Sequence, residues 1–182
     1  MKRRGFLTGA IGLFATRGVA QDQPVSAVKL VRPVRPSQDI SRLSIIDLEG
    51  NPVELQRYAG RIIVLNLWAS WCPPCRREMP SLSWLAEQVD AADITVLPLA
   101  FDRKNPARAE RFFKLAGITN LPILLGDGEN MNSVLGQSLL PTTLILDRNG
   151  QHIYTVKGEA QWDDAPTVKW LNYLVSKPDQ TF

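Results

Sequence analysis

Two cysteines, Cys72 and Cys75, are the residues whose type and spacing most clearly indicate chemistry. They are the only cysteines in the 182 residues and stand in the motif WCPPC at 71–75. A disulfide between them closes a very small loop, so it adds comparatively little stability. A zinc site needs about four ligands, and the sequence adds a single distant histidine, His152. The pair therefore favours reversible thiol–disulfide exchange, with a structural staple or a zinc half-site shared across a dimer as alternatives.

The position of the motif supports this interpretation, because it lies where a buried strand is predicted to end and a helix to begin. Cys72 would stand just ahead of the helix, where free N–H groups and the helix dipole stabilise a thiolate. We expect Cys72 to be the exposed attacking sulfur and Cys75, one turn further, the shielded resolving sulfur. Pro73 and Pro74 fix φ at the helix start, where their missing N–H groups cost least, and they remove two amides that could hydrogen-bond the sulfur.

The hydrophobic pattern predicts the elements that position the motif. The near-continuous apolar run at 61–69 is typical of a strand buried on both faces. It is followed by a helix over 73–89, with apolar residues spaced by three and four. A second buried strand is predicted at 94–101, and a helix over 106–116 has Phe112 and Leu115 on one face and Gly117 as its stop.

Hairpins are predicted on both sides of this region. The first is a short hairpin around Gly50-Asn51, and the second has the strong turn dipeptide Asn149-Gly150. A short strand at 121–126 and a short helix at 129–137 lie between them, and an amphipathic helix over 162–177 closes the chain. This order predicts an α/β domain with a mixed sheet and helices on both faces.

Residues 1–20 have the features of an export signal. Lys2, Arg3 and Arg4 precede a short apolar run, which is well under the roughly 20 residues that span a bilayer. The Arg3-Arg4 pair is similar to a twin-arginine signal, with a Sec signal or an uncleaved anchor as alternatives. With Arg17, this segment carries four basic residues and no acid, so the remainder has 17 basic and 18 acidic residues. We therefore expect a periplasmic protein, soluble after cleavage or else membrane-anchored, that does not bind nucleic acid.

Three further segments complete the predicted organisation. Residues 21–41 are rich in proline and are interpreted as an extended tether, residues 42–177 as the folded domain, and residues 178–182 as a tail.

The strand, WCPPC and helix, followed by LPTTLILD at 140–147, resemble the thioredoxin superfamily. The stretch GRIIVLNLWASWCPPCRREMPSL is similar to the TlpA/ResA-like branch of exported thiol–disulfide oxidoreductases. The resemblance extends over roughly residues 40–176. It implies a thioredoxin-like α/β fold, with a mixed central β-sheet, helices on both faces and an N-terminal β-hairpin.

The resemblance also implies site residues beyond the cysteines. Leu140, Pro141 and Thr142 match a cis-proline loop that faces the CxxC motif and presents its backbone to the substrate. Glu78 matches an acidic residue one turn after the resolving cysteine, where it could relay the proton of that cysteine; a solvated surface glutamate is the alternative. Trp71 is expected to shield Cys72 and offer an apolar docking surface.

For five further residues, the sequence and the resemblance indicate mainly structural roles. Asn66 stands where thioredoxins place a buried, proton-transferring aspartate, and because an amide cannot titrate, that task would pass to Glu78 or water. Trp68 is expected to lie in the core, and Trp162 is expected to pack against other side chains. Pro80 is expected to kink the helix, and His152 to be a surface residue without a function.

We expect an enzyme, a thiol–disulfide oxidoreductase that reduces disulfides of periplasmic client proteins, with a general role ranked above a dedicated one in cytochrome c maturation. It would need no metal or cofactor beyond the Cys72–Cys75 disulfide, receive electrons from a membrane dithiol donor and act as a monomer. A peroxiredoxin is disfavoured because Ala69 stands where a threonine is needed. The alternative from another class is a Cu(I) chaperone using the same cysteines as soft ligands. The motif does not fix the direction of electron flow.

Overall fold

The computed structural model describes residues 24–136 and 139–177. Over these residues the strands are β1 (Val25–Ser26), β2 (Val31–Asp39), β3 (Ile45–Ile46), β4 (Ile62–Trp68), β5 (Ile94–Ala100), β6 (Leu124–Gly126), β7 (Thr142–Leu146), β8 (Gln151–Lys157) and β9 (Ala160–Gln161). The helices are α1 (Ala27–Leu30), α2 (Pro73–Gln88), α3 (Pro106–Ala116), α4 (Gly128–Leu135) and α5 (Ala165–Ser176), with a 3₁₀ helix η1 (Leu55–Tyr58).

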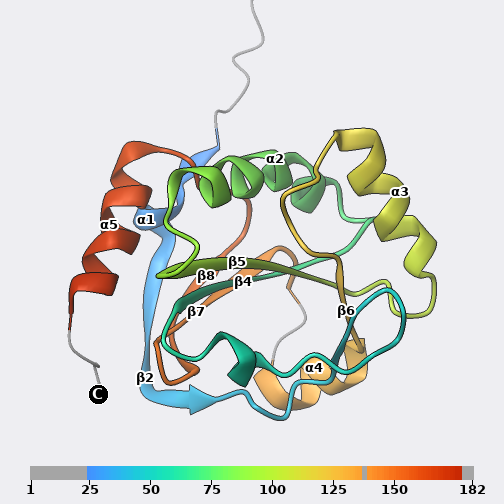
Figure 1. The fold of residues 1–182 in the computed structure, drawn as a ribbon, viewed down its shortest axis with the longest axis horizontal. Helices are drawn as coiled ribbons and strands as arrows, with labels where there is room; N and C mark the ends of the chain where they lie inside the picture. Colours follow the sequence, from blue (N-terminus) through green and yellow to red (C-terminus); the bar gives the residue numbers. More distant parts are fainter. Residues whose placement is uncertain (1–23, 137–138, 178–182) are drawn as a thin grey trace, which may run out of the picture.

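Within the described residues, seven strands form a mixed sheet in the order β2-β8-β7-β4-β5-β6-β3 (Figure 1). The central strands β4, β5 and β6 run parallel, and β7 lies antiparallel on the other side of β4. Strands β1 and β9 pair in parallel as a small second sheet. The predicted mixed sheet is therefore confirmed, and its centre is the strand that leads into the cysteine motif.

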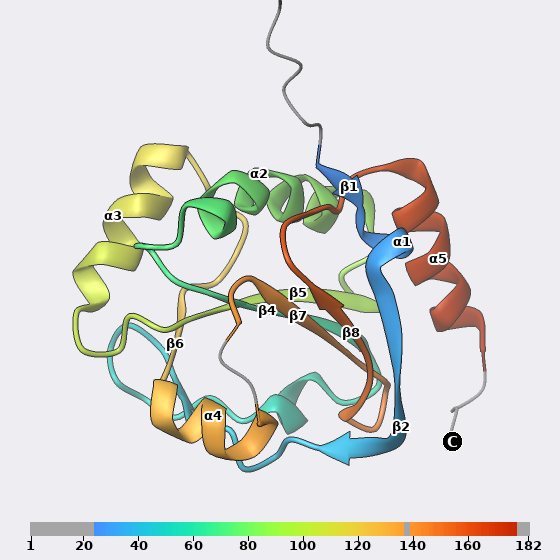
Figure 2. The same ribbon diagram turned by 180° about the vertical axis from the view of Figure 1, so that it is seen from behind.

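Side chains of β4 alternate between two hydrophobic cores, because successive residues of a strand point to opposite faces. One core contains residues of α2, α3 and α5, and the other contains residues of α4 and η1. The two layers are visible on opposite sides of the sheet in Figures 1 and 2. All seven residues of β4 are buried, as the apolar run predicts. The strand is therefore held firmly in the sheet and fixes the position of the cysteine motif that follows it.

The prediction of an extended tether over residues 21–41 is wrong for the part that the structure describes. Strand β2 pairs antiparallel with β8 at the edge of the sheet, and α1 contacts α5. Proline is tolerated there because an edge strand has one side whose N–H groups need no strand partner, and the pairing register is interrupted between Pro33 and Gln38. The folded unit therefore begins well before residue 42.

Both predicted hairpins are present, and the first one is short. Strands β7 and β8 pair around Asn149-Gly150 as expected. Around Gly50-Asn51 the chain turns, and its two arms are antiparallel at the bridge between Ile46 and Pro52. On either side of the bridge, the N–H of Asp47 donates to the carbonyl of Asn51 and the N–H of Val53 donates to the carbonyl of Ile45. The N-terminal hairpin is therefore present in a short form, and β3 also pairs with β6.

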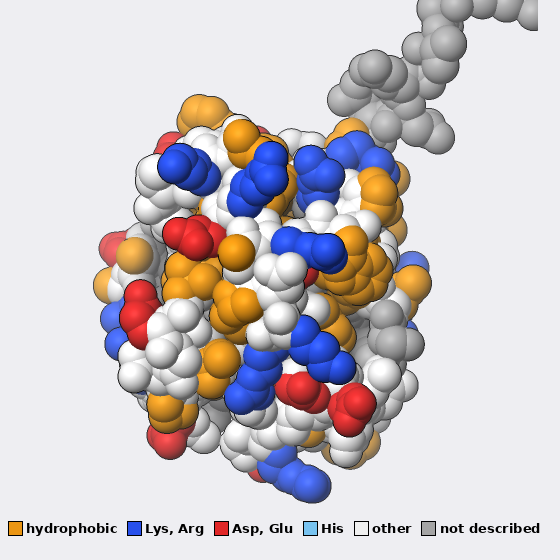
Figure 3. All heavy atoms as spheres, turned by 90° about the vertical axis from the view of Figure 1, so that its right-hand side faces the viewer, with side chains coloured by type: hydrophobic (Ala, Val, Ile, Leu, Met, Phe, Trp, Pro, Cys, Tyr) orange, Lys and Arg blue, Asp and Glu red, His pale blue; other side chains and the backbone are white. Residues whose placement is uncertain are grey.

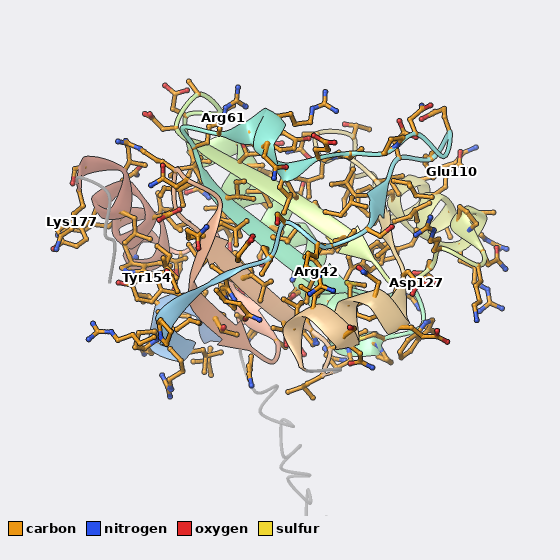
Figure 4. All side chains as sticks on the ribbon, turned by 90° about the horizontal axis from the view of Figure 1, so that it is seen from below. Arg42, Arg61, Glu110, Asp127, Tyr154 and Lys177 are labelled. Atoms are coloured by element: carbon orange, nitrogen blue, oxygen red, sulfur yellow. A yellow bond between two sulfur atoms is a disulfide. The ribbon has the colours of Figure 1, made fainter. Side chains whose placement is uncertain are left out.

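The remaining helices lie close to their predicted ranges. Helix α2 continues through Pro80 to Gln88, and α3 ends at Gly117, whose φ of 68° is left-handed and suits glycine. Figure 4 shows α4 from below, with Asp127 at its beginning, where its carboxylate accepts from the N–H groups of Glu129 and Asn130. Within the described residues, no helix is long and apolar enough to cross a membrane. The predicted export signal and tail lie outside the described residues.

Candidate active site

The two cysteines form a disulfide at the start of α2, with their Cα atoms 5.3 Å apart. Cys72 is the N-cap residue, and Pro73 and Pro74 occupy the first positions of the helix, as the sequence predicts. The side chain of Cys72 is 5% exposed and that of Cys75 is 0% exposed. Cys72 is therefore largely buried, contrary to expectation, but it is the more accessible of the two sulfurs.

Backbone groups hold Cys72 in place. Its N–H donates to the carbonyl of Ala69, and its Sγ accepts from the N–H of Cys75 at 3.3 Å. This N–H points along the helix axis toward the sulfur, so it would stabilise a thiolate there when the disulfide is reduced. The amide of Cys75 thus supplies the stabilisation that the two prolines cannot.

The loop before the motif is fixed by Asp102, a residue that sequence reasoning missed. Both oxygens of this buried carboxylate accept hydrogen bonds from Ser70, one from its N–H and one from its hydroxyl, each at 2.7 Å. Asp102 lies two residues beyond the end of β5, so it lies beside the end of the parallel strand β4. An acidic residue just past a buried parallel strand was the signal that could have revealed it.

Glu78 is buried, and its interpretation as a solvated surface residue is wrong. The residue is 2% exposed, and its carboxyl accepts from the amide of Asn66 at 2.6 Å and from the N–H of Ala160 at 3.0 Å. Burial raises the pKa of Glu78 to about 8, although these hydrogen bonds oppose the shift. Glu78 lies three residues after Cys75 on α2, so a proton-carrying carboxyl and the buried sulfur share the inner face of the helix.

Asn66 connects this carboxyl to the sheet. Its amide nitrogen donates to Glu78 and also to the hydroxyl of Thr143 at 2.9 Å, across the β4–β7 pair. The amide oxygen of Asn66 is buried and has no hydrogen-bond partner within the described residues. A rotated amide would place this oxygen toward Glu78 and could accept the proton of a neutral carboxyl, so Asn66 can accommodate either protonation state.

The loop at Leu140, Pro141 and Thr142 has the predicted cis peptide bond between Leu140 and Pro141. Pro141 and Thr142 are buried, and Leu140 packs against the hydrophobic core that contains both cysteines. The loop thus shares a core with the disulfide, and its position facing the CxxC motif stays a prediction from the resemblance.

Trp71 is 62% exposed, whereas Trp68 is fully buried beside the rings of Phe112 and Phe113, with centroids 5.3 and 5.6 Å away. Trp162 is also fully buried. The predicted division into an exposed Trp71 and two packed indoles is confirmed.

His152 is buried on β8 rather than exposed, which corrects the sequence interpretation. The residue is 3% exposed, its ring shares a hydrogen bond with the hydroxyl of Thr155, and burial lowers its pKa to about 4. Strand β2 pairs with β8 at this position, with Gln38 opposite His152. Across residues 24–136 and 139–177, no group of three or more His, Cys, Asp or Glu is placed to hold a metal ion.

Comparisons with known proteins agree with this geometry. A family model described as Redoxin matches residues 26–171. A curated relative, thiol-disulfide oxidoreductase ResA from Bacillus cereus, is 26% identical over 153 residues, which cover 84% of this chain and 83% of the relative.

Solved structures show the same fold. A DsbF homologue from Corynebacterium diphtheriae is 26% identical with a TM-score of 0.59, and the match covers 77% of this chain and 91% of that one. A secreted thiol-disulfide isomerase from Corynebacterium glutamicum is 22% identical with a TM-score of 0.64, covering 81% and 93%. The predicted thioredoxin-like fold is confirmed.

Proposed function

The chain belongs to the Redoxin family and is a TlpA/ResA-like thiol–disulfide oxidoreductase, and we propose that it acts outside the cytoplasm as a reductant of protein disulfides. The observation that carries this proposal is the disulfide at the N-terminus of α2, with one slightly accessible sulfur, one fully buried sulfur and a buried carboxyl one turn further.

The reaction uses the reduced pair. The thiolate of Cys72 attacks one sulfur of a client disulfide, which forms a mixed disulfide and releases the other client sulfur as a thiolate. The thiolate of Cys75 then attacks the sulfur of Cys72, which forms the Cys72–Cys75 disulfide and releases the second client sulfur. Two electrons pass to the client, and the two protons of the dithiol pass to the client thiolates directly or through solvent.

Glu78 is proposed to take the proton from the thiol of Cys75 before the second step. The support is its burial on the same helical face and a pKa of about 8, which lies near that of a thiol. For Glu78→Gln we expect slower release of the mixed disulfide and a changed pH dependence of that step. Equal release rates across pH 6 to 9 would remove Glu78 from the mechanism.

Trapping tests the roles of the two sulfurs. Cys75→Ser should accumulate mixed disulfides between Cys72 and client proteins, because the second attack is lost. The matched variant Cys72→Ser should accumulate none. Trapping by Cys72→Ser instead would reverse the assignment, and trapping by neither variant would contradict the exchange mechanism.

The direction of electron flow is tested by the reduction potential. A reductant is expected to have a value below roughly −250 mV, whereas a value near −120 mV is typical of an oxidant. A reductant in an oxidising compartment needs a supply of electrons, and we propose a membrane dithiol donor. Equilibration of the protein with glutathione or dithiothreitol buffers measures the potential without knowledge of that donor.

The basic and apolar pattern of residues 1–20 supports the proposal that the protein is exported. For its clients, we rank a general reducing role first, with apocytochrome c and copper-site proteins as more specific candidates. Fractionation of cells should recover the protein outside the cytoplasm, and Arg3→Lys/Arg4→Lys should retain it inside if the signal is of the twin-arginine type. Unchanged export of this variant would favour the Sec route.

A further inference from the structure

A groove of about 310 Å³ begins beside the disulfide and runs along α3. Its apolar residues are Trp71, Phe112 and Leu115, and its basic residues are Arg76, Arg108 and Arg111. Trp71 directly precedes Cys72, and Arg76 directly follows Cys75. Whatever binds in the groove therefore lies next to the redox pair.

The apolar residues of the groove are unusually open to solvent. Trp71 is 62% exposed and Leu115 is 75% exposed. Sequence periodicity correctly places Phe112 and Leu115 on one face of α3, but that face borders the groove, while Phe113 enters the core. Exposed side chains of this size that gather around a concavity are typical of a binding surface.

The charge of the groove is of one sign. Ser70 completes its lining, and no carboxylate belongs to that lining. Among the described residues, no ion pair within 4 Å involves a groove arginine, whereas the neighbouring Arg77 pairs with Glu159. The guanidinium of Arg76 lies over the ring of Phe112, 5.4 Å from its centroid, which keeps it beside the groove.

Neighbouring carboxylates do not pair with the groove arginines. Asp102 lies close by, but both of its oxygens accept hydrogen bonds from Ser70. Glu110 lies on α3 between two of the arginines in sequence but does not line the groove, and Figure 4 shows it at the outer edge of the molecule. Figure 3, which faces α3, shows Lys and Arg side chains beside exposed hydrophobic ones on this side.

We propose that this groove binds an acidic segment of the client protein, in which two or three Asp or Glu residues flank an apolar residue close to the client disulfide. The inference rests on the proposed function and adds the substrate class to it. Guanidinium groups pair well with carboxylates, and the apolar walls accept one hydrophobic anchor. The volume suits a few side chains rather than a whole cofactor.

The location favours a client protein over a lipid surface. The groove is concave, it adjoins the sulfur that must reach the client disulfide, and its charge is local, since residues 21–182 carry 17 basic and 18 acidic side chains. Docking here would raise the effective concentration of the client disulfide at Cys72.

The test uses reduced full-length protein and peptides that each contain one intramolecular disulfide. One peptide carries the flank Glu-Leu-Glu-Glu and its partner the flank Gln-Leu-Gln-Gln, with the flank placed before or after the disulfide in separate pairs. In at least one placement, we expect kcat/KM for the acidic peptide to exceed that for the neutral one by about ten-fold at low salt, because each exposed ion pair contributes a factor of roughly 1.5 to 5. High salt should reduce this preference to within about two-fold.

The variant Arg108→Gln/Arg111→Gln should reduce the preference to within about two-fold. The control Lys114→Gln/Lys169→Gln changes the net charge equally at exposed positions outside the groove and should keep it. Far-UV circular dichroism checks the fold of both variants.

Each other outcome has a distinct meaning. Equal rates on acidic and neutral peptides in every placement, or an unchanged preference in the groove variant, would overturn the docking proposal and leave the proposed function intact. Exchange with no peptide would contradict the proposed function itself. Equal peptide rates combined with arginine-dependent binding to phosphatidylglycerol vesicles, and none to phosphatidylcholine vesicles, would assign the groove to a membrane surface instead.

Discussion

The burial of Glu78 predicts a specific pH dependence of stability. Its pKa is about 8 in the folded protein, whereas a solvated glutamate in the unfolded chain has a pKa near 4.3. Between these values the folded state holds a proton that the unfolded state has released. The contribution of Glu78 to stability is therefore fully present below about pH 4.5 and is lost as the pH rises to 8.

Glu78→Gln removes this titration while keeping a similar shape. At pH 5 the glutamine replaces a neutral acid, and we expect the variant to be less stable by about 1 kcal/mol, the usual net loss of one hydrogen bond. As the pH rises to 9 the variant should become more stable than the original protein, since each pKa unit corresponds to about 1.4 kcal/mol and the total change is roughly 3 to 5 kcal/mol.

Urea unfolding of the oxidised protein measures this difference at several pH values between 5 and 9. Subtracting one protein from the other cancels the groups that both contain, including His152. A matched control is Glu87→Gln, which removes an exposed carboxylate from the same helix. If the difference for Glu78→Gln is constant from pH 5 to 9, Glu78 titrates as a solvated residue, and its proposed proton transfer loses its basis.

Three further predictions concern other buried positions. Asn66→Asp places a second carboxyl within hydrogen-bond distance of Glu78, so we expect a loss of roughly 2–4 kcal/mol at pH 8 and a smaller loss at pH 5; equal losses at both pH values in urea unfolding would contradict the coupling. Gly126→Ala brings a Cβ within 3.2 Å of Leu99 and 2.9 Å of the flexible end of Met131, so we expect about 1–3 kcal/mol of destabilisation, and an unchanged Tm would refute the predicted clash. His152 should titrate near pH 4 by NMR, since burial lowers its pKa; a midpoint near 6.5 would show that its ring is solvated.

The sequence predicts the elements around the disulfide well because their signals are local. A continuous apolar run, two prolines after Cys72 and a spacing of three and four specify the strand, the helix start and the buried helix face. The cis bond before Pro141 came from the resemblance, since leucine–proline bonds are mostly trans.

The errors have a common physical origin in contacts between distant segments. Proline content hides β2, because composition does not distinguish a free tether from a sheet edge. Missing β2 also hides the surroundings of His152, because its strand β8 pairs with β2 and is not an edge strand. The groove is missed for the same reason, because Trp71 and Arg108 meet only through tertiary packing.

Asn66 and Glu78 show why the residue types alone do not predict the pKa of the buried carboxyl. The sequence indicates that an amide replaces a titratable residue on the strand and that a carboxyl lies on the helix, but the consequence depends on their contact. At 2.6 Å the amide donates directly to the carboxyl, and the N–H of Ala160 approaches from a third segment. Two N–H donors lower the pKa of Glu78 and burial raises it more, so the pKa comes close to that of a thiol. Neither residue achieves this alone, so Asn66 is best regarded as the group that tunes Glu78 rather than as a substitute for a lost acid.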